Sequence, residues 1–219
     1  MSGVDCSGKS TQRELLTADL LERGHRVAGI WSRPGYSSGL SSAKKLIRRL
    51  QGKAPKTSGS GHNRSGQYPK RAEHLRKPMI RQLWLSLALT DLILQYGVRF
   101  RALRMLGKTV ICDRYLLDCI VDFRVNFPDD PIEKSLLYRV LEKVAIEPDL
   151  SLCLLVPAEL SLERGRLKSR SHWESARTLE RRYAEYSLAG EQLGVIMIDA
   201  EQSIDEVADN IRQQVETVI

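Results

Sequence analysis

The stretch Gly3-Val4-Asp5-Cys6-Ser7-Gly8-Lys9-Ser10 near the start of the chain has the spacing GxxxxGKS. In this pattern the glycines let backbone N–H groups turn inward around phosphate oxygens, the lysine neutralises terminal phosphates, and the serine hydroxyl can ligate Mg²⁺. An amphipathic segment, Thr11 to Arg23, follows at once, so the dipole of a helix there would strengthen the attraction for phosphate. The simpler alternative is a Gly/Ser-rich turn with an exposed lysine, and the helix behind the motif argues against it.

The remainder of the chain alternates segments typical of strands with segments typical of helices. We expect strands at Arg26–Trp31, Thr109–Cys112, Leu150–Val156 and Val195–Ile198. We expect helices at Thr11–Arg23, Met79–Tyr96, Val98–Leu106 and Arg177–Gly190, one opening at Asp130-Pro131-Ile132-Glu133, one after Pro157, and one behind the capping box Ser203-Ile204-Asp205-Glu206. This alternation predicts a three-layer α/β fold with a parallel sheet flanked by helices, and together with the loop it indicates a P-loop NTPase.

One condition of that fold is not met at the N-terminus. A phosphate loop follows a buried strand, yet only Met1 and Ser2 precede Gly3. We therefore expect the first strand to be missing from the sequence. We interpret this as a sequence that begins late, because losing a central strand would expose two strand edges and apolar surface.

Length and composition favour a single domain over residues 1–219, with 42% hydrophobic residues to form its core. No apolar run approaches the roughly 20 residues of a transmembrane helix, and the N-terminus lacks a signal-peptide pattern. The cysteines Cys6, Cys112, Cys119 and Cys153 are scattered, which favours reduced thiols and a cytoplasmic protein over disulfides or a zinc site.

Positive charge is concentrated in one part of the chain. Residues 33–108 hold 17 Lys/Arg against two acids, Glu73 and Asp91, a local charge of +15, whereas the remaining residues carry −8. We expect a basic, flexible insertion at about 40–78. It is either a solvated loop or a surface for an anionic substrate, an acidic membrane or nucleic acid, and nucleic acid ranks lowest because no binding motif accompanies the charge.

Asp113 and Arg114 follow the apolar strand expected at Thr109–Cys112. A phosphate-loop enzyme places its metal-side or catalytic carboxylate at such a strand end, and an arginine beside it can hold a phosphate through two parallel hydrogen bonds. A surface ion pair is the alternative for an isolated Asp-Arg. The phosphate loop earlier in the same domain favours the functional interpretation.

With these segments the chain resembles the thymidylate kinase family of nucleoside monophosphate kinases. The matching segments run from end to end in the family's order: Gly3 to Gln12, Arg33-Pro34-Gly35, Asp113-Arg114-Tyr115, Val156-Pro157 with Glu159 and Arg164, the basic Arg166, Lys168 and Arg170, and Ile198-Asp199-Ala200 leading into Ser203-Ile204. The phosphate loop and Asp-Arg-Tyr are the specific segments.

The resemblance implies roles for particular residues. ATP would contact Asp5, Cys6, Ser7, Gly8, Lys9, Ser10, Thr11 and Arg166, with Ser10 and Asp113 on the side of Mg²⁺. The small-molecule phosphate acceptor would meet Asp5, Arg33, Pro34, Arg114, Asp118 and Asp122. Lys9, Asp113, Arg114 and Arg170 would act in phosphoryl transfer, the last from a basic lid at about 164–175, for which a solvated helix end is the alternative. Family members commonly form homodimers, and nothing in the sequence decides this.

The chain departs from the family where the base and nucleoside are read. The positions of an aromatic residue and an arginine that read the base fall near Ala88 and Leu92. Asp118 and Asp122 stand where the family has a small hydroxyl residue and then an aromatic or amide residue. These acids either pair with the basic segment or accept hydrogen bonds from the hydroxyls of a sugar.

Three functions compete. The first is ATP-dependent phosphorylation of a nucleoside monophosphate, with dTMP giving dTDP as the leading acceptor. The second is a kinase of the same fold that acts on a sugar or a lipid-linked glycan. The third is a non-catalytic or nucleic-acid-associated ATP-binding module.

Overall fold

The computed structural model describes residues 1–34, 77–167 and 174–219. Residues 40–76 of the predicted basic insertion and residues 168–173 of the predicted lid, with Lys168 and Arg170, therefore lie outside the described residues. The strands are β1 (Ser2–Gly3), β2 (Val27–Trp31), β3 (Thr109–Asp113), β4 (Leu152–Leu155) and β5 (Ile196–Asp199). The helices are α1 (Lys9–Glu22), α4 (Pro78–Leu94), α5 (Phe100–Met105), α6 (Leu116–Asn126), α7 (Leu136–Val144), α8 (Ala158–Leu167), α9 (Ala176–Gln192) and α10 (Ile204–Val215).

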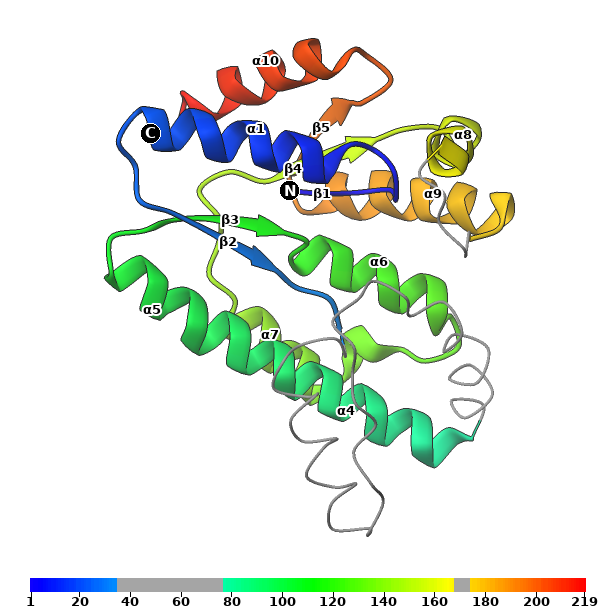
Figure 1. Cartoon of the computed structure of the whole chain (residues 1–219). Coiled ribbons are helices and arrows are strands. Elements are labelled where there is room, and N and C mark those ends of the chain that lie inside the picture. Colours follow the sequence, from blue (N-terminus) through cyan, green and yellow to red (C-terminus); the bar gives the residue numbers. More distant parts are fainter. Residues whose placement is uncertain (35–76, 168–173) are drawn as a thin grey trace, which may run out of the picture.

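All strand pairs are parallel and fall into two groups, β2–β3 and β1–β4–β5. Met1 joins the groups, because its ammonium donates to Cys112 O at 2.7 Å and its carbonyl accepts from Arg114 N at 3.0 Å. The order across the molecule is thus β2-β3-β1-β4-β5. Figure 1 shows α1 and α10 side by side on one side of the strands and α4 to α7 on the other. The predicted three-layer α/β fold with a parallel sheet is confirmed.

The strand ahead of the phosphate loop is short rather than absent. Ser2 pairs with Cys153 and Gly3 with Leu154 of β4. Gly3 has a φ of 136°, and a Cβ there would stand 2.1 Å from Leu154 O. The first glycine of the motif is therefore required by the close approach of two backbones, a role that the sequence pattern had not indicated.

The helix break predicted near Gly97 is wrong. A π-helical segment, η2 (Gln95–Arg99), joins α4 to α5 without interruption. Gly97 packs on Val144 of α7, and Arg101 Nη1 donates to Gly97 O and Val144 O at 2.8 and 2.9 Å. The contact with Val144 and the hydrogen bonds of Arg101 stabilise this π-helical turn, although a glycine by itself favours a break in a helix.

The helix predicted to open at Asp130 begins later. Pro131 has a ψ of 65°, which is not helical, and only a 3₁₀ turn, η3 (Ile132–Lys134), follows it. Ser135 then caps α7 by accepting a hydrogen bond from Tyr138 N. The real N-cap is thus the serine nearest the helix, not the aspartate ahead of the proline.

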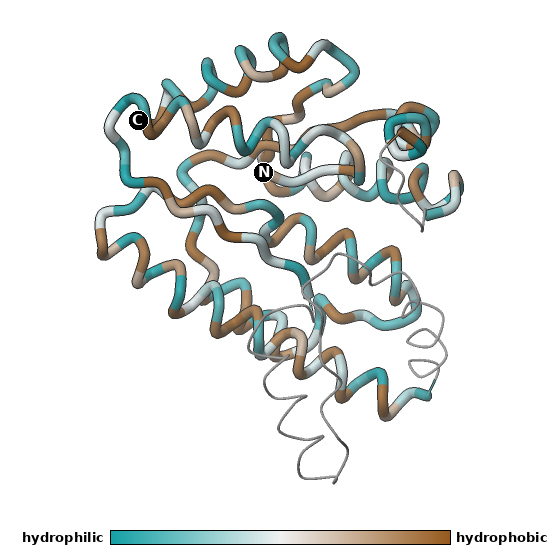
Figure 2. The backbone as a smooth tube through the Cα atoms, in the orientation of Figure 1, coloured by the Kyte–Doolittle hydropathy of each residue, from teal (hydrophilic) through white to brown (hydrophobic). Residues whose placement is uncertain are grey.

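The core is formed by the strands and the helix faces turned toward them. Leu154, Val156, Leu92 and Tyr96 are fully buried in it. Figure 2 shows hydrophobic and hydrophilic residues alternating along α1 and α10 with the helical period. The apolar face of α10 is buried at Val207, Ile211 and Val215, whereas Ile204 is 59% exposed. Among the described helices none has the length and apolar character needed to cross a membrane.

Candidate active site

The phosphate loop closes around the lysine ammonium. Lys9 is the first residue of α1, and its Nζ donates to Gly3 O at 2.9 Å, to Val4 O at 2.5 Å and to Ser7 Oγ at 3.4 Å. Burial and the nearby Arg114 guanidinium lower the pKa of Lys9 to about 8. The loop thus holds a buried cation at the point where the helix begins, as phosphate binding requires.

The first turn of α1 fits a phosphate group. Its N-cap is Gly8, with a φ of 91°, and neither a side-chain cap nor an acidic residue occupies this end of the helix. The first backbone N–H groups of a helix have no partner within the helix, so an anion can accept their hydrogen bonds. Ser10 is exposed on this turn, and Thr11 is half-buried beside it. These features favour the binding of a phosphate group at this end of α1.

Cys6 has a φ of 62°, a left-handed conformation that favours glycine. Its side chain is half-buried, as is that of Cys112, whereas Cys119 and Cys153 are buried. All four are free thiols, as predicted. Strained backbone of this kind is concentrated at functional loops, and here it lies in the middle of the phosphate-binding motif.

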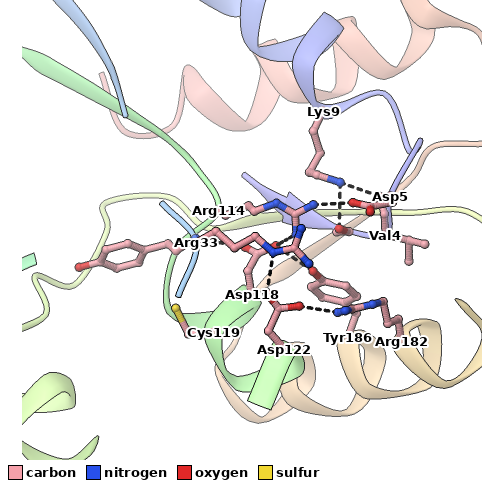
Figure 3. Close-up of polar contacts among 12 residues, drawn as sticks. Val4, Asp5, Lys9, Arg33, Arg114, Asp118, Cys119, Asp122, Arg182 and Tyr186 are labelled. Atoms are coloured by element: carbon pink, nitrogen blue, oxygen red, sulfur yellow. Dashed lines mark hydrogen bonds and ion pairs between the residues drawn. The ribbon is translucent and has the colours of Figure 1, made fainter. Parts of the chain in front are cut away.

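Arg114 connects the end of β3 to the phosphate loop. Its backbone φ is 76°, and its buried guanidinium donates from Nη2 to Asp5 Oδ1 and from Nη1 to Asp118 Oδ1 at 3.4 Å. Figure 3 shows the Arg114 side chain between these two carboxylates. Burial would raise the pKa of Asp5, but Arg114 and Lys9 hold it well below its ordinary value. Asp5 is therefore a charged anchor for Arg114.

Asp118 is enclosed by protein donors. It is 1% exposed and accepts hydrogen bonds from Arg114, from Tyr186 Oη at 2.8 Å and from Tyr115 N at 3.1 Å. Its carboxylate orients Arg114 and caps α6. A sugar hydroxyl that donates a hydrogen bond to Asp118, as the sequence hypothesis requires, would have to compete with these three donors.

Asp122 lies between two arginines, one on each carboxylate oxygen. Arg33 Nε donates to Oδ2 at 3.2 Å and Arg182 Nη1 to Oδ1 at 2.6 Å (Figure 3). Burial would raise the pKa of Asp122, but Arg33 and Arg182 lower it below its ordinary value. Arg182 also donates from Nε to Glu174 at 2.6 Å. Arg33 lies in the basic segment of residues 33–108, and Arg182 lies outside it. The alternative that the acids pair with the basic segment therefore explains only one of the two ion pairs of Asp122.

Sequence reasoning missed Arg182, Tyr186 and Arg13. Their spacing could have revealed the first two: Arg182 and Tyr186 follow the buried Leu179 by three and seven residues, so all three lie on the same face of α9. Arg13 lies one turn after Lys9 on α1, and its Nη1 donates to Asp113 Oδ2 at 3.1 Å. Asp113 is 7% exposed at the end of β3.

Other predicted residues lie apart from this cluster. Ala88 and Leu92 of α4 are fully buried in the hydrophobic core of the protein. Pro34 is buried next to the half-buried Arg33. Arg164 donates to Ala200 O at 2.8 Å, which fixes α8 to the end of β5, whereas Arg166 is exposed on the last turn of α8.

No group of three or more metal-ligating residues occurs among residues 1–34, 77–167 and 174–219. Mg²⁺ is commonly bound through one or two protein oxygens together with substrate phosphates. The Ser10 hydroxyl and the Asp113 carboxylate are oxygen donors of that kind, and Asp113 Oδ2 also accepts a hydrogen bond from Arg13.

Comparison with known proteins decides the family. The family model for thymidylate kinase matches residues 94–211, more than half of the chain. The chain belongs to the thymidylate kinase family. It is also similar to a probable thymidylate kinase of Archaeoglobus fulgidus, with 24% identity over 220 residues that cover all of this chain and 94% of the relative. Membership makes the protein a nucleotide kinase that transfers phosphoryl groups, and the prediction of an enzyme of this family is confirmed.

Proposed function

We propose that this kinase transfers the terminal phosphoryl group of ATP to a nucleoside monophosphate, with dTMP as the acceptor and dTDP as the product. The observation that carries the proposal is the pairing of Arg114 with Asp5. It brings the arginine at the end of β3 to the loop that would bind ATP, so donor and acceptor phosphates would meet there.

Phosphoryl transfer requires positioning and cations around a spreading negative charge. Lys9, with the N-terminus of α1, would hold the terminal phosphates of ATP. Arg114 and Arg33 would hold the acceptor phosphate, and Asp5 would face the acceptor's sugar. Mg²⁺ would sit with Ser10 and the nucleotide phosphates, on the side of Asp113, where it would neutralise their charge. Arg166 and Arg170 would approach from the donor side.

The test is a panel of dTMP, dUMP, UMP, dCMP, dAMP and dGMP with ATP and Mg²⁺, followed by chromatography of the diphosphates. We expect dTMP to have a kcat/KM at least about tenfold above the other nucleotides, a discrimination of about 1.4 kcal/mol. The Lys9→Ala variant is the control and should show no turnover. Product formation equal to this control with every nucleotide would overturn the proposal.

A second acceptor class is favoured by one observation. Ala88 and Leu92 are buried in the core, so neither side chain reads a base. The same phosphate site with another recognition surface would suit a sugar phosphate or a lipid-linked glycan. Turnover of such acceptors, with none of the six nucleotides phosphorylated, would favour this class over dTMP. A third outcome, ATP binding without any turnover, would favour the non-catalytic module.

A further inference from the structure

Ser161 of α8 donates a hydrogen bond to the backbone of the phosphate loop. Its Oγ lies 2.7 Å from Asp5 O, across 156 residues of sequence, and the residue is 2% exposed. A serine inside a helix commonly donates to the carbonyl four residues before it, which for Ser161 is Pro157 O. Here Pro157 O accepts from Ser161 N at 3.0 Å, and the hydroxyl is directed out of the helix to the loop.

Helix α8 is a fixed support for this hydroxyl. Arg164, one turn after Ser161, donates from Nη1 to Ala200 O at 2.8 Å, where β5 ends. Figure 1 shows the loop that joins β1 to α1 turning beside α8. The Ser161 bond therefore connects the loop to an element that is anchored to the sheet independently of the loop.

The bond sets the orientation of the peptide group between Asp5 and Cys6. In a trans peptide the C=O and the N–H point in opposite directions, and the described residues contain no cis peptide bond. Because Asp5 O faces α8, the Cys6 N–H faces away from α8, on the side where α1 begins (Figure 1). Within the described parts of the chain no backbone carbonyl accepts from Cys6 N. An N–H group in this orientation can donate to a phosphate oxygen.

The same peptide group is strained at Cys6. Its φ of 62° lies in the left-handed region, where a Cβ crowds the backbone, so a cysteine adopts it less readily than a glycine. Rotating the peptide group by about half a turn would return the φ of Cys6 to the ordinary negative range. The rotation would also turn Asp5 O toward the phosphate and break the bond to Ser161. The Ser161 hydroxyl therefore opposes the rotation that Cys6 favours.

We propose that Ser161 is a positioning residue for ATP, which holds the Asp5–Cys6 peptide group with its N–H turned to the phosphates. The inference rests on the ATP binding of the proposed function. The opposing rotation changes the ψ of Asp5 and the φ of Cys6, and it leaves the Asp5 carboxylate on Arg114. Ser161 therefore acts on the donor nucleotide and has little effect on the acceptor.

Titration calorimetry with ATP and Mg²⁺ measures this role as the ratio of dissociation constants without and with the hydroxyl. We expect Ser161→Ala to raise the ATP dissociation constant about fivefold, the effect of one lost hydrogen bond, and to leave the KM for dTMP nearly unchanged. Ser187→Ala is the matched control, because Ser187 Oγ donates to Tyr183 O within α9 at 3.0 Å. It should bind ATP as the wild type does.

Substitutions at Cys6 separate the backbone from the thiol. A glycine adopts the left-handed φ at no cost, so adding Ser161→Ala to the Cys6→Gly chain should raise the dissociation constant by about twofold or less. Cys6→Ala removes the thiol and keeps the Cβ. Adding Ser161→Ala to the Cys6→Ala chain should again raise the dissociation constant about fivefold.

Three results would overturn the inference. An ATP dissociation constant unchanged by Ser161→Ala would show that the hydroxyl does not position the loop. An equal ratio in the Cys6→Gly and Cys6→Ala chains would show that strain at Cys6 plays no part. A KM for dTMP raised as much as the ATP dissociation constant would assign Ser161 a general structural role.

Failure of the proposed function would look different. The wild type would then bind ATP and phosphorylate no nucleotide. A ratio of about fivefold, confined to the chains that keep a Cβ at residue 6, would still support the positioning role of Ser161.

Discussion

Arg114, on the left-handed turn after β3, donates a hydrogen bond to Asp5 of the phosphate loop, across 109 residues of sequence. The arginine is 8% exposed, and a second carboxylate, Asp118, holds its other terminal nitrogen. One buried and one half-buried carboxylate therefore fix one cation at the junction of the phosphate loop and the acceptor side. This arrangement gives Arg114 a set position before any phosphate arrives.

Replacing Arg114 tests its role in transfer. We expect Arg114→Met to lower kcat/KM for the acceptor by about 10²–10³, because charge-assisted bonds to the transferring group are lost. Arg139→Met on the exposed face of α7 is the control and should retain activity. Since Arg114→Met leaves the buried Asp118 carboxylate without its cation, it should also lose about 3–5 kcal/mol of stability. Arg114→Lys separates the two effects by keeping the charge without the fork. Steady-state kinetics with unchanged activity in both variants would contradict the assignment.

Replacing Arg182 tests whether Asp122 positions Arg33. We expect Arg182→Met to raise the KM for the acceptor about tenfold, equivalent to about 1.4 kcal/mol, and to leave the KM for ATP nearly unchanged. The adjacent Arg181→Met is the matched control, because Arg181 is exposed and bonds only to Arg124 O among the contacts found in the described chain.

The pH dependence of the same variant supplies a second measurement. In the wild type the lowered pKa of Asp122 stabilises the fold at pH values above the carboxyl's unfolded pKa, and this contribution is lost as pH falls through the folded pKa. Without Arg182, the pKa of Asp122 should be higher than in the wild type, because one of the cations that lower it is gone. The loss of acceptor affinity on acidification should then begin at a higher pH than in the wild type. Identical pH profiles of acceptor KM would show that Arg182 is purely structural.

Replacing Gly3 of the phosphate loop tests the close approach of β1 to β4. Gly3→Ala should lower Tm by at least about 10 °C, because a Cβ at that position overlaps Leu154 O and the backbone cannot move away without breaking β1. Gly29→Ala on β2 is the control, since a Cβ there meets nothing within 4 Å. Thermal unfolding by calorimetry measures both. A Gly3 variant as stable as the Gly29 variant would contradict the close approach.

The lowered pKa of Lys9 in the phosphate loop leads us to expect that ATP binding depends on pH. The pKa of Lys9 is lowered to about 8, so its ammonium loses its proton as pH rises from 7 to 9. The ATP dissociation constant should therefore increase above pH 8, approaching tenfold per pH unit if one proton is taken up on binding. Lys9→Arg keeps its charge over this range and should bind with a flatter profile. Titration calorimetry at several pH values makes the comparison, and a flat wild-type profile would contradict the lowered pKa.

The parts of the fold and site that could be predicted were encoded in short stretches of sequence. The phosphate loop, the strand delivering Asp113-Arg114 and the capping box of α10 each depend on a few neighbouring residues. Gly97 misled because its packing partner, Val144, lies in α7, and Arg101 bonds to the carbonyls of both residues. Arg13 and Arg182 were missed because their partners, Asp113 and Asp122, stand 100 and 60 residues away. Such pairings become visible only when parallel strands and α9 place distant segments together.

The most direct test of the proposed transfer follows the γ-phosphoryl group itself, using ATP labelled with ³²P at that position, Mg²⁺ and dTMP. We expect the label to appear in dTDP with the wild type. No label should appear in dTDP with Lys9→Ala, and a strongly reduced amount should appear with Arg114→Met. Label that stays in ATP, or appears only in free phosphate, while the protein is folded and binds ATP would show that dTMP is not the acceptor.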